Sequence, residues 1–410
     1  MSWQTVKLGD VMTVGRGSSP RPIKDERFFT GGTIPWVKIA DATASGKFIY
    51  QTNQHVNDYG ASFSRKLKPG ALIFPASGTL GIPRFLGVEA CIHDGWLYFS
   101  DYQGIDPDWL YYRIILLKNY YEGIAYGAAI QNINTDIVRN TEIQLPDLAT
   151  QRAMTAVLGT YDDLIATNQR RIALLEDAAR RLYREWFVHL RFPGHESVPV
   201  KDGVPEGWCR KTIEDFIEIQ SGFAFKSGTF EPEGLYGLVT IRNVQDGEFL
   251  ANCESSLNLI PDKMPPECKL KTGDILVSLT GNVGRCCLVV GNNLLLNQRV
   301  AKLIPKKLSY RELAYLLFRD ENFRKSLESL SNGAAQQNLS PIKMGKVEIA
   351  FAPEEVFQLF SELTNHSIEQ ILILKEQNQQ LAQARDLLLP KLMSGQLDVS
   401  GIALPDEVAA

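Results

Sequence analysis

The stretch "KLKPGALIFPASGTLG" at residues 66–81 decides how the chain is organised, because it occurs twice. Its second copy, "KLKTGDILVSLTGNVG", lies at residues 269–284, an offset of 203 positions. Each copy has a turn at a glycine, then a short apolar run, then a second glycine-rich turn. This pattern predicts a buried strand between two turns in each copy.

Three further phrases repeat in the same order along the chain. "WQTVKLGD" at residues 3–10 matches "WCRKTIED" at 208–215, and Ile39 in "VKIADA" aligns with Ile241. "GAAIQN" at 127–132 returns as "GAAQQN" at 333–338. The offsets lie between 202 and 206 residues, whereas solenoid repeats are about 20–50 residues long. The sequence therefore predicts one duplicated domain.

Within each copy the pattern is α+β. The stretches "DPDWLYYRIILLKNYY" (106–121) and "SYRELAYLLFRDENFRKSL" (309–327) have helical spacing, and Asp106 and Ser309 are predicted as their N-caps. "TEIQLP" (141–146) and "VEIAFAP" (347–353) are predicted strands that follow the repeated "GAA-x-QN" loops.

A different pattern follows each copy: one residue on a common face at alternating steps of four and three, as in a coiled-coil seam. The first seam consists of Met154, Leu158, Tyr161, Ile165, Asn168, Ile172, Leu175, Ala179, Leu182 and Trp186. The second, 206 residues later, consists of Phe360, Thr364, Ser367, Ile371, Leu374, Asn378, Leu381, Arg385, Leu388 and Leu392. We predict two long helices over these segments.

The sequence leaves two arrangements of these helices open: pairing with each other, or packing separately on their own domains. Residues 148–193 carry seven basic and five acidic side chains, and residues 353–410 carry three and nine, so the two segments are predicted to attract each other. Asn168 lies two residues before the midpoint of its seam and Asn378 two residues after its own. In an antiparallel pair the two amides face each other; alternatively, each lies at a solvated edge.

Composition and motifs restrict the class of protein. The chain has 410 residues, 44% of them hydrophobic, no apolar run long enough for a membrane span, and six cysteines without a CxxC pair. A soluble, reduced, cytoplasmic protein is expected. No phosphate-loop, methyltransferase or HExxH motif is present. "PDKMPPECK" (261–269) superficially matches a nuclease pattern, but a Pro-Pro pair separates its carboxylates. The chain is predicted to be non-catalytic, with neither a metal nor a bound cofactor.

Three phrases resemble one known family. "RDLLLPKLMSGQLDV" (385–399), "ARRLYREWFVHLRFPG" (179–194) and "VPEGW" (204–208) are similar to segments of the specificity subunits of type I restriction-modification systems, the HsdS family. The resemblance covers essentially the whole chain. The starts of the helices depart from it: family members often have Pro-x-x-Glu-Gln there, whereas this chain has "PDLATQ" (146–151) and "APEE" (352–355).

The resemblance implies a fold and a function. The fold is α+β, with two tandem α/β target recognition domains at 1–147 and 194–352. Long helices at 148–193 and 353–410 join them as an antiparallel coiled coil, with pseudo-two-fold symmetry overall. Each domain reads one half of a bipartite, asymmetric double-stranded DNA target. The helices space the domains and dock two methylation subunits, which bind S-adenosylmethionine, while restriction subunits supply ATP- and Mg²⁺-dependent cleavage. The alternative is a scaffold that binds methylation subunits without reading DNA.

The residues that contact DNA are expected in loops that the two halves do not share, because identical loops cannot distinguish different half-sites. The candidates in the first half are Ser18, Ser19, Arg21, Lys24 and Arg84, and those in the second are Phe225, Lys226, Ser227, Arg242, Asn243, Asn282 and Arg285. The amides of the shared phrase either bind adenine or have a phosphate-binding or structural role; they are Gln131, Asn132, Gln337 and Asn338. Both domains carry balanced charge, so the partner subunits are expected to supply much of the DNA affinity.

Overall fold

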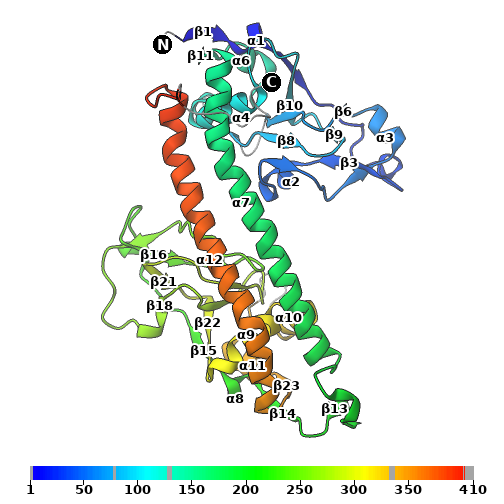
Figure 1. Cartoon of the computed structure of the whole chain (residues 1–410), viewed down its shortest axis with the longest axis vertical. Coiled ribbons are helices and arrows are strands. Elements are labelled where there is room, and N and C mark those ends of the chain that lie inside the picture. Colours follow the sequence, from blue (N-terminus) through cyan, green and yellow to red (C-terminus); the bar gives the residue numbers. More distant parts are fainter. Residues whose placement is uncertain (1–2, 77–79, 127–131, 332–337, 400, 402–410) are drawn as a thin grey trace. The chain divides into compact units, whose positions relative to one another are not determined.

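The chain folds into two compact units. The computed structural model describes residues 3–76, 80–126, 132–331, 338–399 and 401. Unit 1 combines residues 1–166 with 380–410, and unit 2 comprises residues 167–379. The long helices α7 (Leu148–Tyr183) and α12 (Glu354–Met393) each contribute one end to each unit (Figure 1). Among the described residues, no helix combines the length and apolar character that a membrane crossing requires.

Unit 1 is built on three sheets, with strand orders β1-β11, β2-β10-β7-β8-β4 and β5-β3-β9-β6. Its elements are β1 (Gln4–Lys7), α1 (Leu8–Val11), β2 (Thr13–Arg16), β3 (Ile34–Val37), α2 (Ile39–Ala44), β4 (Phe48–Ile49), β5 (His55–Val56), α3 (Asp58–Ser62), β6 (Arg65–Leu67), β7 (Leu72–Pro75), β8 (Arg84–Leu86), β9 (Ala90–Ile92), β10 (Trp96–Ser100), α4 (Pro107–Leu116), α5 (Lys118–Tyr126), α6 (Thr135–Arg139) and β11 (Glu142–Leu145).

Unit 2 contains a hairpin, β12-β13, and three sheets with orders β14-β23, β15-β22-β19-β20 and β17-β16-β21-β18. Its elements are β12 (Val200–Lys201), β13 (Val204–Pro205), β14 (Cys209–Thr212), α8 (Ile213–Phe216), β15 (Ile217–Ser221), β16 (Tyr236–Val239), β17 (Ser256–Leu257), β18 (Lys269–Leu270), β19 (Ile275–Ser278), β20 (Cys286–Leu288), β21 (Leu294–Leu296), β22 (Val300–Pro305), α9 (Arg311–Phe318), α10 (Glu321–Leu330), α11 (Pro341–Gly345) and β23 (Glu348–Phe351).

The two units share one strand topology, which confirms the predicted duplication. Strands β14 and β23 pair as β1 and β11 do, and the order β15-β22-β19-β20 reproduces β2-β10-β7-β8. The third sheet repeats as well, including its parallel pair: β3 with β9 in unit 1 and β16 with β21 in unit 2. The repeated apolar runs form β7 and β19, which are buried along their whole length.

The predicted helix is interrupted in each unit, and in unit 1 the one expected over 106–121 divides at Leu117, between α4 and α5. Asp106 caps α4 as expected, accepting from the backbone N–H groups of Asp108 at 2.9 Å and Trp109 at 3.1 Å. Ser309 is not an N-cap, because its hydroxyl donates instead to Glu354 at 2.7 Å and α9 begins two residues later. The helix predicted over 309–327 divides at Asp320, whose side chain accepts from the first free N–H groups of α10. A residue that satisfies those groups starts a new helix.

The long helices begin near the predicted boundaries. α7 starts at Leu148 and runs without interruption to Tyr183, where a π-helical turn, Arg184–Val188, ends it. α12 runs from Glu354 to Met393. The compact units do not follow the four segments expected from sequence, because the end of each helix packs into the core of the nearest predicted target recognition domain. We call these two domains, 1–147 and 194–352, the recognition blocks.

The seam positions are the buried face of both helices. Their side chains are buried or half-buried throughout, whereas most residues between them are exposed. Even the polar members are covered: Asn168 is 8% exposed and Thr364 is 2% exposed. The alternation of four and three residues therefore identified the packing face correctly.

Contacts within each unit establish antiparallel pairing. In unit 2, Asn168 Nδ2 donates to Asn378 Oδ1 at 3.0 Å, and the rings of Trp186 and Phe360 lie 5.6 Å apart. Trp186, in the π-helical turn after α7, lies eighteen residues after Asn168, and Phe360 of α12 lies eighteen residues before Asn378. In unit 1, Arg385 Nη1 lies 2.5 Å from Asp162 Oδ1. The hydrogen bond confirms that the two asparagines are neighbours.

The helices also pack on their own recognition blocks, so the two arrangements left open by the sequence occur together. In unit 2 the core joins Tyr183 of α7 and Ile371 of α12 to Leu313 and Phe318 of the recognition block. The net charges of the two segments do not account for the ion pair between the helices. The ion pair between the two helices, in the part of the chain that is described, has its base on the acidic segment and its acid on the basic one.

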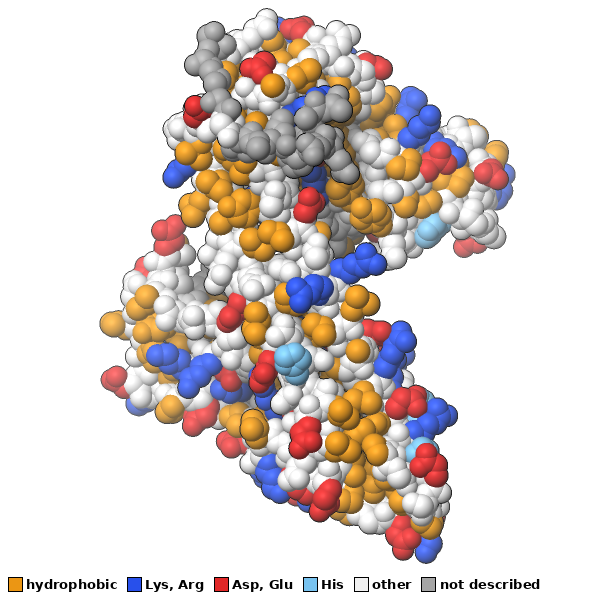
Figure 2. Space-filling model, viewed as in Figure 1, with side chains coloured by type: hydrophobic (Ala, Val, Ile, Leu, Met, Phe, Trp, Pro, Cys, Tyr) orange, Lys and Arg blue, Asp and Glu red, His pale blue; other side chains and the backbone are white. Residues whose placement is uncertain are grey.

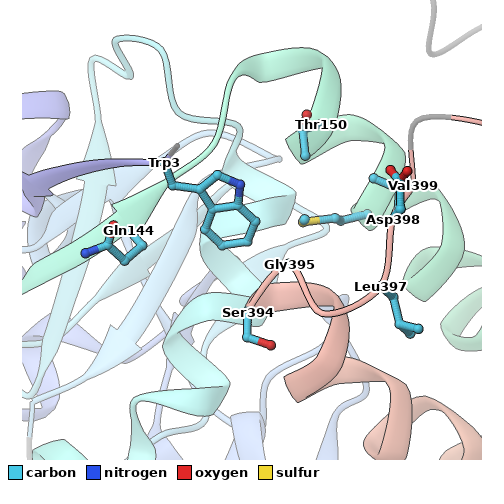
Figure 3. Close-up of a pocket in the computed structure, with 9 residues that line it drawn as sticks. Trp3, Gln144, Thr150, Ser394, Gly395, Leu397, Asp398 and Val399 are labelled. Carbon is cyan, nitrogen blue, oxygen red and sulfur yellow. The ribbon is translucent and has the colours of Figure 1, made fainter. Parts of the chain in front are cut away.

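The segment after α12 closes against Trp3, the residue before β1 of unit 1. Gly395 ends the helix with a φ of +74°, and a Cβ atom there would lie 2.9 Å from the Trp3 ring, so glycine is required. Figure 3 shows the resulting pocket, with Trp3 and Gln144 on one side and the residues that follow Ser394 on the other. Its volume is about 490 Å³. The phrase "SGQLDV" therefore has a packing role in unit 1.

The asparagine pair generates a stability prediction. Asn168→Leu leaves the Asn378 amide against hydrocarbon without its partner, which is expected to lower the free energy of unfolding by about 1–3 kcal/mol. The double variant Asn168→Leu/Asn378→Leu is expected to regain wild-type stability or exceed it, because an apolar seam has no unpaired amide.

Urea unfolding measures the free energy of unfolding of both variants. The control is Asn365→Leu, on the exposed side of α12. Additive losses in the double variant would contradict direct coupling of the two amides.

Candidate nucleic-acid interface

The second glycine-rich turn of unit 2 presents two of the predicted contact residues. Gly281 and Gly284 have φ values of +75° and +79°, a backbone conformation that favours glycine. The Ser278 hydroxyl closes the turn by donating to the carbonyl of Asn282 and accepting from the backbone N–H of Arg285 at 3.1 Å. The repeated glycines therefore form a rigid turn that carries Asn282 and Arg285.

Asn338, the last residue of the second shared phrase, and Leu339 after it lie against this turn. The backbone N–H of Leu339 donates to the carbonyl of Leu279 at 2.8 Å, and the Thr280 hydroxyl donates to Asn338 Oδ1 at 3.3 Å. In unit 1 the N–H of Ile133 donates to the carbonyl of Ala76 at 2.7 Å in the equivalent place. The two shared phrases thus support each other, which favours the structural role over base reading.

Only two of the four shared amides belong to residues that the structure describes. Gln131 and Gln337 lie outside the described residues. Asn338 is exposed beside the turn, and Asn132 is half-buried, with no hydrogen-bond partner for its side-chain oxygen among the described residues. Contact of any of them with DNA stays a prediction.

Three of the predicted residues of unit 2 come together through Gln245. Its side-chain nitrogen donates to the carbonyl of Arg242 at 2.8 Å, and its oxygen accepts from Arg285. The Asn282 amide oxygen, in its hydrogen-bonding orientation, accepts from the Arg285 guanidinium at 3.1 and 3.2 Å. The Arg242 side chain is 73% exposed and pairs with Glu254. We name Arg242, Gln245, Asn282 and Arg285 the turn cluster.

Two predicted residues of unit 2 are corrected by their burial. Phe225 is 8% exposed and belongs to a core with Phe249 and Leu296. Asn243 is 3% exposed, accepts from the N–H of Thr240 at 2.9 Å, and donates to the carbonyl of Leu250 at 2.7 Å. A buried side chain that satisfies backbone groups has no free face for a base.

Lys226 and Ser227 remain available in the same loop. Both are exposed, and Ser227 begins the 3₁₀ turn Ser227–Thr229. Their contact with DNA stays a prediction, as it does for the exposed members of the turn cluster.

The candidates near the N-terminus of unit 1 gather around Asp94. The Ser19 hydroxyl donates to Asp94 Oδ1 at 2.7 Å, Arg21 pairs with the other carboxylate oxygen, and Arg16 donates to the Asp94 carbonyl at 2.7 Å. Burial alone would raise the pKa of Asp94, but Ser19 and Arg21 lower it. The Arg21 side chain is still 68% exposed.

The remaining members of this group vary in exposure. Ser18 is half-buried beside Ser19, and Lys24 is exposed. The loop that carries Arg21 is therefore ordered by one carboxylate while its basic side chains reach solvent.

Arg84 is partly engaged by the scaffold. Its side chain is half-buried and donates to the carbonyls of Ala42 at 3.0 Å and Pro83 at 2.9 Å. Burial lowers the pKa of Arg84. The bond to Ala42 holds α2 against β8, and contact of Arg84 with DNA stays a prediction.

Sequence reasoning missed two residues that organise these sites. Gln245 links Arg242 to Arg285, and Asp94 orders the loop of Ser19 and Arg21. Gln245 was detectable, because it lies in the unshared stretch "IRNVQDGEF" (241–249) beside two named candidates. Asp94 was not, because its role depends on pairing across 73 residues of chain.

Comparison with known proteins adds independent evidence. A family model described as the type I restriction modification DNA specificity domain matches residues 1–177 and again 205–383. A type I restriction enzyme specificity subunit, MjaVIII, of Methanocaldococcus jannaschii is 24% identical over 98% of this chain and 94% of its own length. The HindI specificity subunit of Haemophilus influenzae is 21% identical over 96% and 99%.

A solved structure shares the fold. The crystal structure of a type I restriction-modification S subunit from M. genitalium aligns with a TM-score of 0.56 at 14% identity, covering 95% of this chain and 96% of that one. This likeness supports the tandem arrangement of two recognition blocks with long helices.

The burial pattern predicts a large loss of stability for one substitution and almost none for its neighbour. Phe225→Ala removes a buried aromatic ring and is expected to lower the stability of unit 2 by about 3–5 kcal/mol. Lys226→Ala is expected to change it by less than about 0.5 kcal/mol, because that side chain is exposed. Urea unfolding monitored by tryptophan fluorescence checks both. Equal losses would show that the assignment of Phe225 to the core is wrong.

Proposed function

The chain belongs to the type I restriction-modification DNA specificity family, and from that premise we propose that each of its two repeats reads one half of a divided DNA target. The observation that carries the proposal is that one strand topology occurs twice while the loops around it differ. A common scaffold with different loops suits two different half-sites. The family model, which matches both halves, supports this reading.

The turn cluster and the loop of Arg21 are the proposed reading surfaces. An arginine guanidinium donates two parallel hydrogen bonds to guanine, and an asparagine or glutamine amide pairs with adenine. Arg242 and Arg21 are largely exposed, and each is held by a carboxylate, Glu254 and Asp94 respectively. A carboxylate that orients an exposed arginine reduces the number of conformations lost when the arginine meets a base.

Methylation and cleavage are assigned to partner subunits in this proposal. S-adenosylmethionine, ATP and Mg²⁺ are expected to bind there, while this chain supplies recognition. The described residues contain no group of three or more His, Cys, Asp or Glu side chains placed to hold a metal ion.

The long helices are the proposed docking surfaces for methylation subunits. Exposed hydrophobic side chains occur on both helices: Leu164 and Leu174 on α7, and Leu359, Leu363, Ile373 and Leu387 on α12. Figure 2 shows hydrophobic side chains gathered over the part of the helices that belongs to unit 2. Exposed apolar patches on a helix indicate a partner surface.

The experiment that tests reading directly is sequencing of the methylated adenines of the host genome with and without this gene. We expect a motif with two specified blocks and a fixed gap that is methylated only when the gene is present. An unchanged methylation pattern would favour the alternative, a scaffold that binds methylation subunits without reading DNA.

The assignment of one half-site to each repeat gives a mutational prediction. Arg21→Ala is expected to relax one half of the target and Arg242→Ala the other, each by about 1–3 kcal/mol at the affected positions. Methylation profiles of the two variants measure this. Arg181→Ala, an exposed arginine of α7 paired with Asp177, is the control. Relaxation of both halves by either variant would argue against one half-site per repeat.

Partner dependence gives a second prediction. The purified chain alone is expected to neither methylate nor cleave DNA with any cofactor. Activity is expected when methylation subunits are added at about two copies per chain, because two similar units imply two similar docking surfaces. Native mass spectrometry and a methyl-transfer assay measure this. A single bound copy, or activity of the lone chain, would contradict it.

A further inference from the structure

We propose that an ion-pair network joining α7 to loop 240–250 is a positioning device for the turn cluster, and that it sets how stringently unit 2 reads its half of the target. This inference rests on the proposed function, since it concerns the strength of reading by one repeat. All of its residues belong to unit 2.

The centre of the network is a buried arginine. Arg319, which follows α9, has a side chain only 6% exposed, and its Nε and Nη2 lie 2.7 and 2.6 Å from Glu176 Oε1 on α7. The Tyr315 hydroxyl donates to the same carboxylate oxygen at 3.3 Å. A buried charge pair is strongly orienting, because moving either partner leaves an uncompensated charge in the interior.

The same arginine holds the loop. Arg319 Nη1 pairs with Asp246, and Arg324 Nη1 lies 3.0 Å from the other oxygen of that carboxylate. Next along the loop, the carbonyl of Gly247 accepts from Lys375 Nζ of α12 at 2.6 Å. Cations from three different helical segments therefore fix two consecutive residues of the loop.

Gly247 is the residue that permits this approach. Its φ of +81° favours glycine, and a Cβ atom there would collide with the Arg319 guanidinium. Its backbone N–H donates to the carbonyl of Cys286 at 2.8 Å, which ties the loop to β20. Both backbone polar groups of Gly247 are thus hydrogen-bonded.

The fixed residues are adjacent to the turn cluster. Gln245 precedes Asp246 and bonds both Arg242 and Arg285, so the position of the loop determines where those side chains point. A contact made by α7 at Glu176 is in this way connected, through Arg319 and Asp246, to the residues proposed to read bases. Reading geometry must be held to within a fraction of an ångström to discriminate bases.

Unit 1 is built differently at the corresponding place. The carboxylate of α7 there, Asp162, accepts from the Tyr112 hydroxyl at 2.6 Å and pairs with Arg385 of α12. Among the described residues, Asp162 hydrogen-bonds or pairs with Tyr112 and Arg385, neither of which lies in a proposed reading loop. The coupling that we propose therefore concerns the second repeat. The effect of breaking the network is therefore expected at one half-site only.

Asp246→Ala is the decisive variant, because it releases the loop while Arg319 keeps its partner Glu176. Asp262→Ala, the same substitution at an exposed position of unit 2, is the matched control. Arg319→Met is a second variant that breaks the network at its centre. If it fails to fold, Asp246→Ala still decides the question.

Two measurements are made on the full chain. Amide hydrogen exchange of the free chain reports loop 240–250 directly. We call the half of the target read by unit 1 the first half and the half read by unit 2 the second half. The affinity of the complex with methylation subunits is then measured on four duplexes: the identified target, the target with the first half altered, with the second half altered, and with both altered.

We expect Asp246→Ala to speed exchange at the Gly247 amide by about tenfold or more, because local opening becomes easier. A mismatch in the second half, which weakens wild-type binding by about 5- to 150-fold, is expected to weaken the variant by less than about threefold. The penalty for a mismatch in the first half stays at its wild-type value, and Asp262→Ala matches wild type in both assays.

Unchanged exchange in the loop would overturn the proposal, as would equal loss of selectivity at both halves or full selectivity at the second half despite faster exchange. If the wild-type complex discriminates at neither half, the proposed function itself fails, and that outcome is recognised before any variant is considered.

Discussion

Antiparallel pairing of α7 with α12 is the constraint on which each unit depends. Neither recognition block closes its core with its own residues: unit 1 includes Met154, Leu158, Leu389 and Leu392, and unit 2 includes Trp186, Phe360 and Ile371. These cores form only when the two helix ends lie at one register. The Asn168–Asn378 hydrogen bond satisfies two amides at that register, and a shifted pairing would place each amide against hydrocarbon.

The two units share one backbone topology but differ in their polar contacts. Both units use a tyrosine of the recognition block to bind a carboxylate on α7, Tyr112 with Asp162 and Tyr315 with Glu176. The arginine that completes each group comes from α12 in unit 1 and from the recognition block in unit 2. The two copies of the scaffold are therefore joined to the long helices by different ion pairs, consistent with two repeats that read different sequences.

Periodicity and repetition made much of the fold predictable. The spacing of Leu158, Asn168 and Trp186 identified the packing face, because helix geometry alone places residues at such steps on one side. The repeated apolar runs located β7 and β19. The direction of the charge pairing was not predictable, because Asp162 and Arg385 act as individual neighbours and net charge averages over whole segments.

The candidate site was less predictable, because burial depends on contacts distant in sequence. Phe225, Asn243 and Arg84 are of types that bind DNA, but a core, a turn and two backbone carbonyls occupy them. Arg242 and Arg285 lie in unshared stretches, whereas Asn282 lies within the repeated stretch 269–284. Gln245, three residues after Arg242, bonds Arg242 and, across 40 residues of chain, Arg285. The sequence indicated residue types that suit DNA but not the contacts across the fold that bury or engage some of them, and contact of the exposed ones with DNA stays a prediction.

The central claim is that two repeats read two separate blocks of bases. The most direct measurement is selection of bound duplexes from a fully randomised library by the complex of this chain with its methylation subunits. The account predicts two blocks of specified positions at one fixed separation, with mismatch penalties in the two blocks that add. A single continuous block, or the same blocks at variable separation, would contradict it.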